Sequence, residues 1–305
     1  MDPITRALLL SWEWRLEVII PVLLLGVLYT AGWRRLRFRR RRRPAQMANG
    51  WRLVAYWAGL ILIALALLSP IETLSGQLFL MHMIQHLLLV MFAPPLLLLA
   101  NPLPFILWGL PAPARVQTGK ALSHLLHRKS SFRRYLRLAT SPGVVWFLFV
   151  FFLIGWHDPG LYNAALRSDL VHDIEHLTFF LSAMLYWWHV VGAGPRIHKR
   201  FSRPAQVMYV IAAIPPNMFT GVAITFANQP IYTYYLSVPR LWGLDALSDQ
   251  QLGGLIMWVP GSMMYIIAVL IITARWLQGE EKKPPFPVAQ VSTRERMAAP
   301  GLKHE

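Results

Sequence analysis

Residues 81–95 read MHMIQHLLLVMFAPP and belong to one of the most apolar stretches of the chain. An apolar run that reaches about 20 residues is long enough to cross the hydrocarbon core of a bilayer as a helix. His82 and His86 stand four residues apart in this run, so a helix places both imidazoles on one face. Polar side chains in hydrocarbon cost free energy and usually serve a function. The stretch therefore predicts a membrane helix that carries a polar site.

The composition of the whole chain agrees with a membrane protein. Of its 305 residues, 55% are hydrophobic and only 14% are charged, against about 25% charged in a typical soluble domain. Hydropathy places about seven spans, at residues 16–33, 53–69, 78–99, 144–156, 171–191, 205–227 and 252–276. We therefore predict an all-α, polytopic membrane bundle of about seven transmembrane helices in residues 1–276. The polar segment 277–305 is predicted to be a disordered cytoplasmic tail.

The charge of the segments between the predicted spans alternates along the chain. The basic segments are 34–52, 115–137 and 196–203, and the segments with mainly acids are 71–76, 157–169 and 229–249. Basic segments of membrane proteins face the cytoplasm. We predict a multi-pass protein of the bacterial cell (inner) membrane, with its N-terminus outside and its C-terminus in the cytoplasm. The arginine run from Arg34 to Arg43 is then a cytoplasmic anchor against membrane lipid, and no nucleic-acid site is expected.

Proline marks three places where the helical pattern is disturbed. Pro94–Pro95 and Pro215–Pro216 interrupt the third and sixth predicted spans. Proline lacks a backbone N–H and bends a helix, so these pairs predict either kinks needed for packing or a widened cleft. The proline-broken apolar segment 101–111 is predicted to lie at the membrane interface.

The fifth predicted span carries a second histidine pair, in LVHDIEHLTFF. Two imidazoles one helical turn apart can chelate one metal ion, and two such helices can close a site. A fifth histidine ends the fourth span. The predicted metal ligands are His82, His86, His157, His172 and His176. Carboxylates that could ligate the ion or orient the imidazoles are Glu72, Asp158, Asp173, Glu175 and Asp249. For Asp249, capping of a helix N-terminus is an equal alternative.

Three interpretations of the histidines remain open at the level of spacing. Imidazole ligands suit copper, zinc and iron, and thioethers favour Cu(I); Met81, Met83, Met218 and Met257 lie in the same halves of their spans as the histidines. Two histidines on facing helices can also ligate a haem iron. The third interpretation is a structural polar network without any metal. The chain has no cysteine, which excludes thiolate ligands and disulfides, and no recognisable catalytic motif, so no enzyme is predicted.

Three blocks of the chain resemble the signature blocks of the polytopic CtaG family. They are MHMIQHLLLVMFAPPLLLLANP, WHDPGLYNAALRSDLVHDIEHLTFFLSAMLYWW and LDALSDQQLGGLIMWVPG, in this order between Trp51 and Trp276. The resemblance implies an assembly factor for caa3-type cytochrome c oxidases that aids formation of the CuB centre.

The function expected from this resemblance and the histidines is that of a copper-binding membrane chaperone. The cofactor would be copper, as Cu(I), and the partners would be the oxidase subunit under assembly and a copper donor protein. A haem-binding membrane electron carrier and a metal-free structural chaperone of the oxidase are the alternatives.

Overall fold

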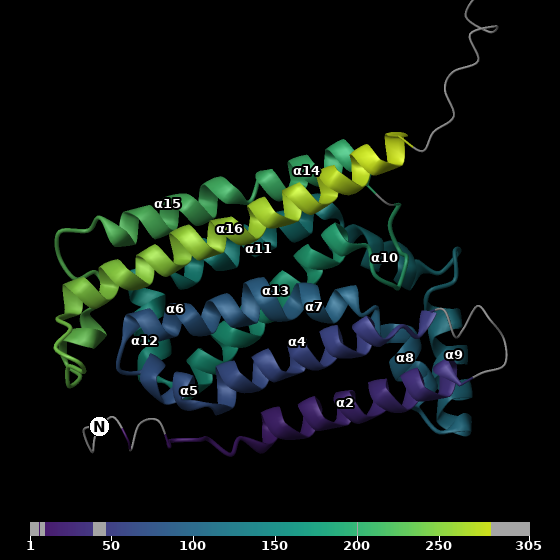
Figure 1. Cartoon of the computed structure of the whole chain (residues 1–305), viewed down its shortest axis with the longest axis horizontal. Helices are drawn as coiled ribbons and strands as arrows, with labels where there is room; N and C mark the ends of the chain where they lie inside the picture. Colours follow the sequence, from purple (N-terminus) through teal and green to yellow (C-terminus); the bar gives the residue numbers. More distant parts are fainter. Residues whose placement is uncertain (1–5, 7–9, 39–46, 200, 282–305) are drawn as a thin grey trace, which may run out of the picture.

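The computed structural model describes residues 6, 10–38, 47–199 and 201–281. All regular elements in these residues are helical, as predicted. The long helices run side by side and form a bundle (Figure 1). The elements are α2 (Leu16–Arg37), α4 (Gly50–Leu68), α5 (Pro70–Ser75), α6 (Phe79–Leu87), the π-helix η1 (Leu88–Phe92), α7 (Ala93–Leu99), α8 (Pro102–Gly109), α9 (Ala112–Leu125), α10 (Ser131–Ala139), α11 (Pro142–Trp156), α12 (Pro159–Arg167), α13 (Asp169–Val191), α14 (Arg203–Ile211), α15 (Ile214–Thr225), the 3-10 helix η2 (Thr233–Leu236) and α16 (Ala246–Glu281).

Five helical segments of the described chain are long and apolar enough to cross a membrane. They are Leu16–Arg37, Gly50–Leu68, Phe79–Leu99, Arg203–Thr225 and Ala246–Glu281. α10 and α11 make a sixth candidate if they are taken as one span, although the chain bends by 48° between them. α13 is long enough with 23 residues, but the histidines and acids near its start lower its hydropathy. The structure thus gives five or six candidates, and the count of seven stays a prediction.

Differences from the predicted boundaries are small and fall at the ends of the bundle. The basic segment 115–137, predicted as a loop, is largely helical and forms most of α9 and all but the end of α10. α16 continues to Glu281, so the first residues of the predicted tail are helical. The rest of that tail, 282–305, and Arg39 to Arg43 of the arginine run lie outside the described residues.

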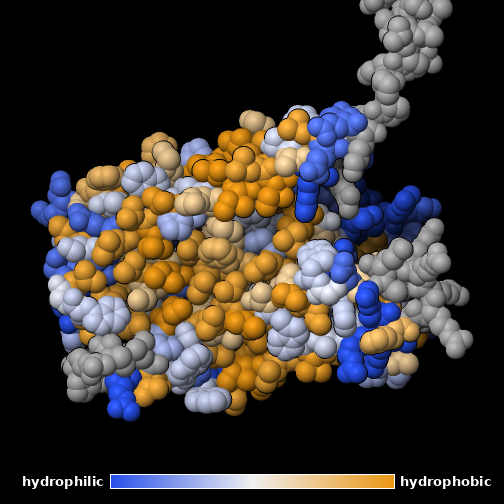
Figure 2. All heavy atoms as spheres, in the orientation of Figure 1, coloured by the Kyte–Doolittle hydropathy of each residue, from blue (hydrophilic) through white to orange (hydrophobic). Residues whose placement is uncertain are grey.

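The surface of the bundle is apolar in its middle. Figure 2 shows a broad hydrophobic band there, with hydrophilic residues gathered at the two ends. Large apolar side chains such as Phe147, Phe219 and Leu270 are 63–70% exposed. An exposed apolar surface of this extent marks contact with a membrane or a partner. Together with the long apolar helices, it identifies a membrane protein.

α2 and α16 both run toward the end of the bundle where α9 and α10 lie (Figure 1). Arginines cluster at that end, in the last turn of α2 and along α10. The opposite end holds α5, α12 and η2. Because basic segments face the cytoplasm, we expect the end with α9 and α10 to be the inner one. The membrane orientation itself stays a prediction.

The proline pair of the third span closely follows a π-helical turn. Pro94 has no N–H to donate to the carbonyl of Val90, and a freed carbonyl inside a membrane protein needs another donor. The indole Nε1 of Trp187, on α13, donates to this carbonyl at 3.0 Å. This hydrogen bond therefore joins the third span to α13.

α8 packs against the second half of α2 at a crossing of two glycines. A Cβ on Gly32 would lie 1.7 Å from the carbonyl oxygen of Phe105, and one on Gly109 would lie 1.9 Å from that of Leu28. Only glycine lets the two backbones approach so closely. The segment 101–111 is thus tied to α2, and its interfacial position stays a prediction.

Candidate metal site

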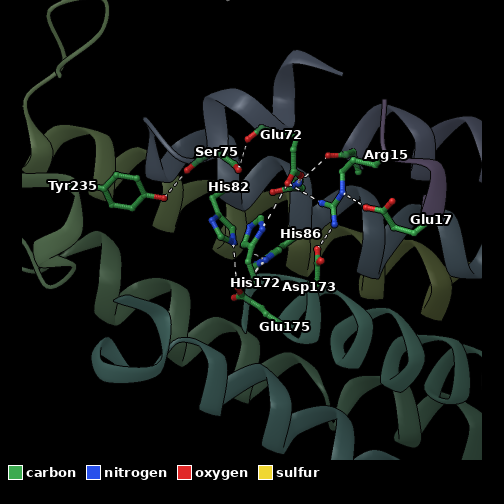
Figure 3. A network of polar contacts seen from close by, with 12 residues as sticks. Arg15, Glu17, Glu72, Ser75, His82, His86, His172, Asp173, Glu175 and Tyr235 are labelled. Carbon is green, nitrogen blue, oxygen red and sulfur yellow. Dashed lines mark hydrogen bonds and ion pairs between the residues drawn. The ribbon is translucent and has the colours of Figure 1, made fainter. Parts of the chain in front are cut away.

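The two histidine pairs meet between α6 and α13, as their spacing predicted. Nε2 of His82 lies 2.8 Å from Nε2 of His86 on the same helix. The ring of His82 lies 5.3 Å from that of His172 and 5.8 Å from that of His176, measured between centroids. One possible ligand atom from each of His82, His172 and His176 lies within 4.8 Å of the other two. Figure 3 shows the imidazoles of His82, His86 and His172 turned toward one another.

Glu175 places a carboxylate between the two pairs. Its oxygens lie 3.7 Å from Nε2 of His82 and 3.6 Å from Nε2 of His86. These three residues form a second group whose ligand atoms lie within 4.8 Å of one another. Two nitrogens that bind one ion at about 2.0 Å lie about 3–4 Å apart, so the spacing suits a shared ion. We call His82, His86, His172, His176 and Glu175 the histidine–glutamate cluster.

Several polar atoms of this cluster have no hydrogen-bond partner in the described part of the chain. Both oxygens of Glu175 and both nitrogens of His176 are buried without a hydrogen bond there, as are Nδ1 of His82, Nδ1 of His86 and Nε2 of His172. The side chains of His82 and Glu175 are fully buried. A buried carboxylate without a partner is costly, and a bound cation would compensate it. The residues present therefore fit a metal ion.

The helix that carries the first pair is held at its start by α16. The carboxylate of Asp249 accepts hydrogen bonds from the backbone N–H groups of Phe79 at 2.9 Å and Leu80 at 3.0 Å. Arg240 donates to the same carboxylate at 3.0 Å. Asp249 thus caps a helix N-terminus, which is one of the two predicted roles for it. The helix that it caps is α6, whereas Asp249 itself lies in α16. It touches no histidine and acts by fixing α6.

Two further predicted carboxylates also lie away from the ligand atoms. Asp158 caps α12, accepting from the backbone N–H groups of Gly160 and Leu161. The predicted contact of Asp158 with the histidines is therefore corrected, because the carboxylate is used by its own helix. The side chain of Asp173 is 45% exposed and forms an ion pair with Arg15. Asp173 directly follows His172 in α13, and adjacent residues of a helix do not share one face. The carboxylate of Asp173 therefore does not join the cluster.

Glu72 borders the cluster from α5. Its carboxylate lies 3.6 Å from Nδ1 of His172 and accepts a hydrogen bond from Arg15 at 3.3 Å. Gln85 also donates to it. Burial raises the pKa of Glu72 to about 7, although the neighbouring Arg15 opposes this shift. Glu72 therefore lies between His172 and Arg15, which belongs to the segment before α2 (Figure 3), and its role in orienting His172 stays a prediction.

Two further residues next to the cluster, Arg15 and Gln85, were not predicted from the sequence. Arg15 is a basic residue at the predicted outer end, which makes it an exception to the charge alternation. Gln85 is fully buried between the two histidines of α6 and also donates to the carbonyl of Ala66 at 2.8 Å. A buried amide in an apolar helix is the signal that identifies it.

His157 lies beside the cluster but belongs to neither ligand group. Its ring lies 6.2 Å from that of His86. Its Nδ1 contacts the carbonyl of Leu153 at 2.7 Å, and its Nε2 is buried without a partner among the described residues. His157 thus lies outside the two groups of ligand atoms, and its role as a metal ligand stays a prediction.

The remaining described histidines lie elsewhere. His189 and His198 both contact Thr140, far along the bundle from α5. His124 and His127 are exposed in and just after α9. His304 lies outside the described residues.

The comparison with family models decides the relationship of the chain. The model for the cytochrome c oxidase caa3 assembly factor (Caa3_CtaG) matches residues 27–279. The chain belongs to this family. The match covers the helices from the middle of α2 to the end of α16, and with them every residue of the histidine–glutamate cluster. The family description is that of an assembly factor for an oxidase.

Curated relatives come from mycobacteria. The chain is 27% identical over 278 residues to an uncharacterized protein of Mycobacterium leprae, which covers 88% of this chain and 40% of that protein. It is 26% identical over 284 residues to an uncharacterized protein of Mycobacterium bovis, with the same coverage. The chain thus spans less than half the length of these relatives. No solved structure matches it.

Proposed function

We propose that this protein binds copper at the histidine–glutamate cluster and passes it to a subunit of a cytochrome c oxidase during assembly. The copper is cargo, carried as Cu(I) and used to form the CuB centre. Membership of the caa3 assembly factor family supports the role in oxidase assembly. The histidine–glutamate cluster supports the binding of a metal ion.

The observation that carries the proposal is the buried carboxylate of Glu175 among four imidazoles. Neutral imidazoles and one carboxylate form a ligand set that suits copper, zinc and iron. The ligand atoms already lie within 4.8 Å in each group of three, and several have no partner in the described residues. A structural polar network would use its hydrogen-bonding atoms instead, because unpaired buried groups destabilise a protein.

The packing of the rings favours an ion over haem. The imidazoles of α6 and α13 contact each other directly, with centroids of 5.3–5.8 Å between the helices. A haem bound between these helices needs a planar slot between its two ligands. The direct ring contacts occupy the space in which the macrocycle would lie.

The partners follow from this role. An oxidase subunit that receives the ion and a protein that donates it must both approach the end of the bundle near α5. We propose that this end faces outward from the bacterial cell membrane, and that the basic end contacts anionic lipid.

Replacement of His82 and His86 by alanine tests the proposal. Alanine suits both helix and lipid, so the double variant should insert. Loss of two ligands should leave the oxidase of the same cells deficient in copper at CuB. The matched control is the His124→Ala/His127→Ala variant, whose exposed histidines lie outside the cluster and should have no effect.

The measurement is the copper content of the purified oxidase, normalised to the membrane abundance of each variant. Abundance matters because a destabilised variant would imitate a lost function. Full copper in the oxidase together with a stably inserted double variant would contradict the proposal.

A further inference from the structure

A small cavity lies next to the histidine–glutamate cluster. Its volume is about 40 Å³, and Met83, Met91, Met257, His86, His157 and Asn217 contribute to its lining. His86 belongs to both the cavity and the cluster. We call this space the methionine cavity.

Three methionines reach the methionine cavity from separate elements. Met83 lies on α6, Met91 on η1 and Met257 on α16, and their exposed fractions are 2%, 3% and 8%. Other methionines of the bundle, such as Met208 and Met263, are more than half exposed on its apolar surface. The buried thioethers are therefore gathered at one place, beside the imidazoles.

His157 contributes a nitrogen that is ready to bind. Its Nδ1 lies 2.7 Å from the backbone carbonyl of Leu153, which has no proton to give, so Nδ1 must carry the proton. The tautomer is thereby fixed, and Nε2 keeps its lone pair. This nitrogen is buried and has no hydrogen-bond partner within the described residues. The same arrangement orients histidine ligands in metal sites.

Part of the cavity wall comes from an irregular helical turn. Met91 and Val90 belong to the π-helical turn before Pro94, and both line the cavity. π-turns inside α-helices often occur at functional sites. The side-chain nitrogen of Asn217 is occupied by the carbonyl of Met257 at 3.2 Å and by the hydroxyl of Ser262, so this amide fixes α16 against α15.

We propose that the methionine cavity is a second copper site that binds Cu(I) through thioethers and Nε2 of His157. This inference rests on the proposed function, because the second site would lie next to the histidine–glutamate cluster and exchange copper with it. Thioethers are soft ligands that select Cu(I). None of the residues that line the cavity carries a carboxylate, so a divalent ion would keep its full charge there, which is costly in an apolar site. Cu(I) can move between the two sites past His86, which borders both.

The test compares two triple variants with the natural protein. Met83→Leu/Met91→Leu/Met257→Leu removes the thioethers and nearly conserves volume. Met208→Leu/Met218→Leu/Met263→Leu is the matched control, since these methionines are 40–64% exposed and none lines the cavity. Each purified full-length protein is loaded without oxygen with Cu(I) alone, or separately with Zn(II) alone. The readouts are bound metal per chain and sulfur scattering in the copper X-ray absorption spectrum.

We expect sulfur scattering in the Cu(I) spectrum of the natural protein and of the control variant. The cavity variant should lose this signal and bind less Cu(I), but it should bind Zn(II) as before, because Zn(II) reports on the histidine–glutamate cluster. A natural protein whose bound Cu(I) shows no sulfur scattering would overturn the inference without any variant. Unchanged sulfur scattering in the cavity variant would overturn it as well.

Failure of the proposed function gives a different pattern. If the natural protein binds neither Cu(I) nor Zn(II), the cluster is not a metal site and both proposals are refuted. If Zn(II) and Cu(I) bind without sulfur ligands, the proposed metal site at the cluster is supported and only the copper site in the methionine cavity is refuted.

Discussion

At the scale of single residues, the central feature is a carboxylate that has no partner of its own. Both oxygens of Glu175 are buried without a hydrogen bond in the described chain, and the nearest ring nitrogens lie 3.6 and 3.7 Å away. Removing a polar group from water without giving it a hydrogen bond destabilises a protein. The apoprotein is therefore expected to bear a cost that a bound cation relieves.

Glu175→Gln tests separately the cost to the apoprotein and the binding of the cation. Glutamine has nearly the same shape as glutamate and cannot carry a negative charge. The apoprotein of this variant should be about as stable as the natural one, since an amide of nearly the same shape replaces a buried carboxyl group that has no hydrogen bond. Its affinity for copper should fall by about tenfold or more, so added copper should raise the thermal midpoint less.

Thermal unfolding with and without copper measures both effects. Asp169→Asn, on an exposed residue at the start of the same helix, is the control and should respond to copper like the natural protein. A Glu175→Gln variant with the full copper-induced shift would show that the carboxylate is no ligand.

Much of the residue-level arrangement was present in the sequence. His172, Glu175 and His176 lie three and four positions apart and therefore share one helical face, which excludes Asp173. Helical spacing alone thus distinguishes the carboxylate that enters the cluster. It does not reveal Arg15, which meets Asp173 across 158 positions of the chain, or the separation of His157, which depends on how α11 ends.

At the scale of elements, the third span and α13 are joined by more than the histidines. Pro94 deprives the carbonyl of Val90 of its helical donor, and Trp187 supplies the replacement at 3.0 Å. Hydropathy predicted both helices, and the proline pair predicted a disturbance of the helical hydrogen bonds at this place. The donor was not predictable, because it depends on the packing of two segments that are distant in the sequence.

Trp187→Phe tests this link between elements. Phenylalanine keeps an aromatic ring but cannot donate, so the buried carbonyl loses its partner at a cost of about 1–3 kcal/mol. Trp188→Phe is the control, since its indole donates at 2.8 Å to the carbonyl of Ala193 in a partly exposed position and should cost less. The free energy of unfolding in mild detergent is the measurement. Equal losses of unfolding free energy in both variants would show that the hydrogen bond of Trp187 contributes no more to stability than that of Trp188.

At the scale of the whole molecule, the bundle separates charge and polar chemistry between its ends. Arginines gather at the end with α9 and α10, and the histidine–glutamate cluster lies nearer α5. Because α13 carries the polar side of this cluster, its hydropathy falls below that of the other long helices, and the count of spans from hydropathy alone becomes five or six. The polar residues of α13 that form part of the site thus lower its hydropathy, so that α13 is not counted among the candidate spans.

Reporter fusions determine which end faces the cytoplasm. The positive-inside rule predicts that fusions after Arg137 and Arg203 read cytoplasmic and that a fusion after Gly76 reads external. A fusion after Glu281, the last described residue, should also read cytoplasmic. A cytoplasmic signal after Gly76 would refute the predicted seven-span topology and place the cluster on the wrong side for an outward-facing donor.

The most direct test of the central claim is the metal content and optical spectrum of the purified protein after loading with copper and dialysis, beside the His172→Ala/His176→Ala variant. These two histidines belong to the cluster and do not line the methionine cavity. We expect the natural protein to retain copper without a Soret band, and the variant to retain less copper and, after a separate loading with Zn(II), less Zn(II). A Soret band without copper, or a stable variant that holds copper and Zn(II) as the natural protein does, would contradict it.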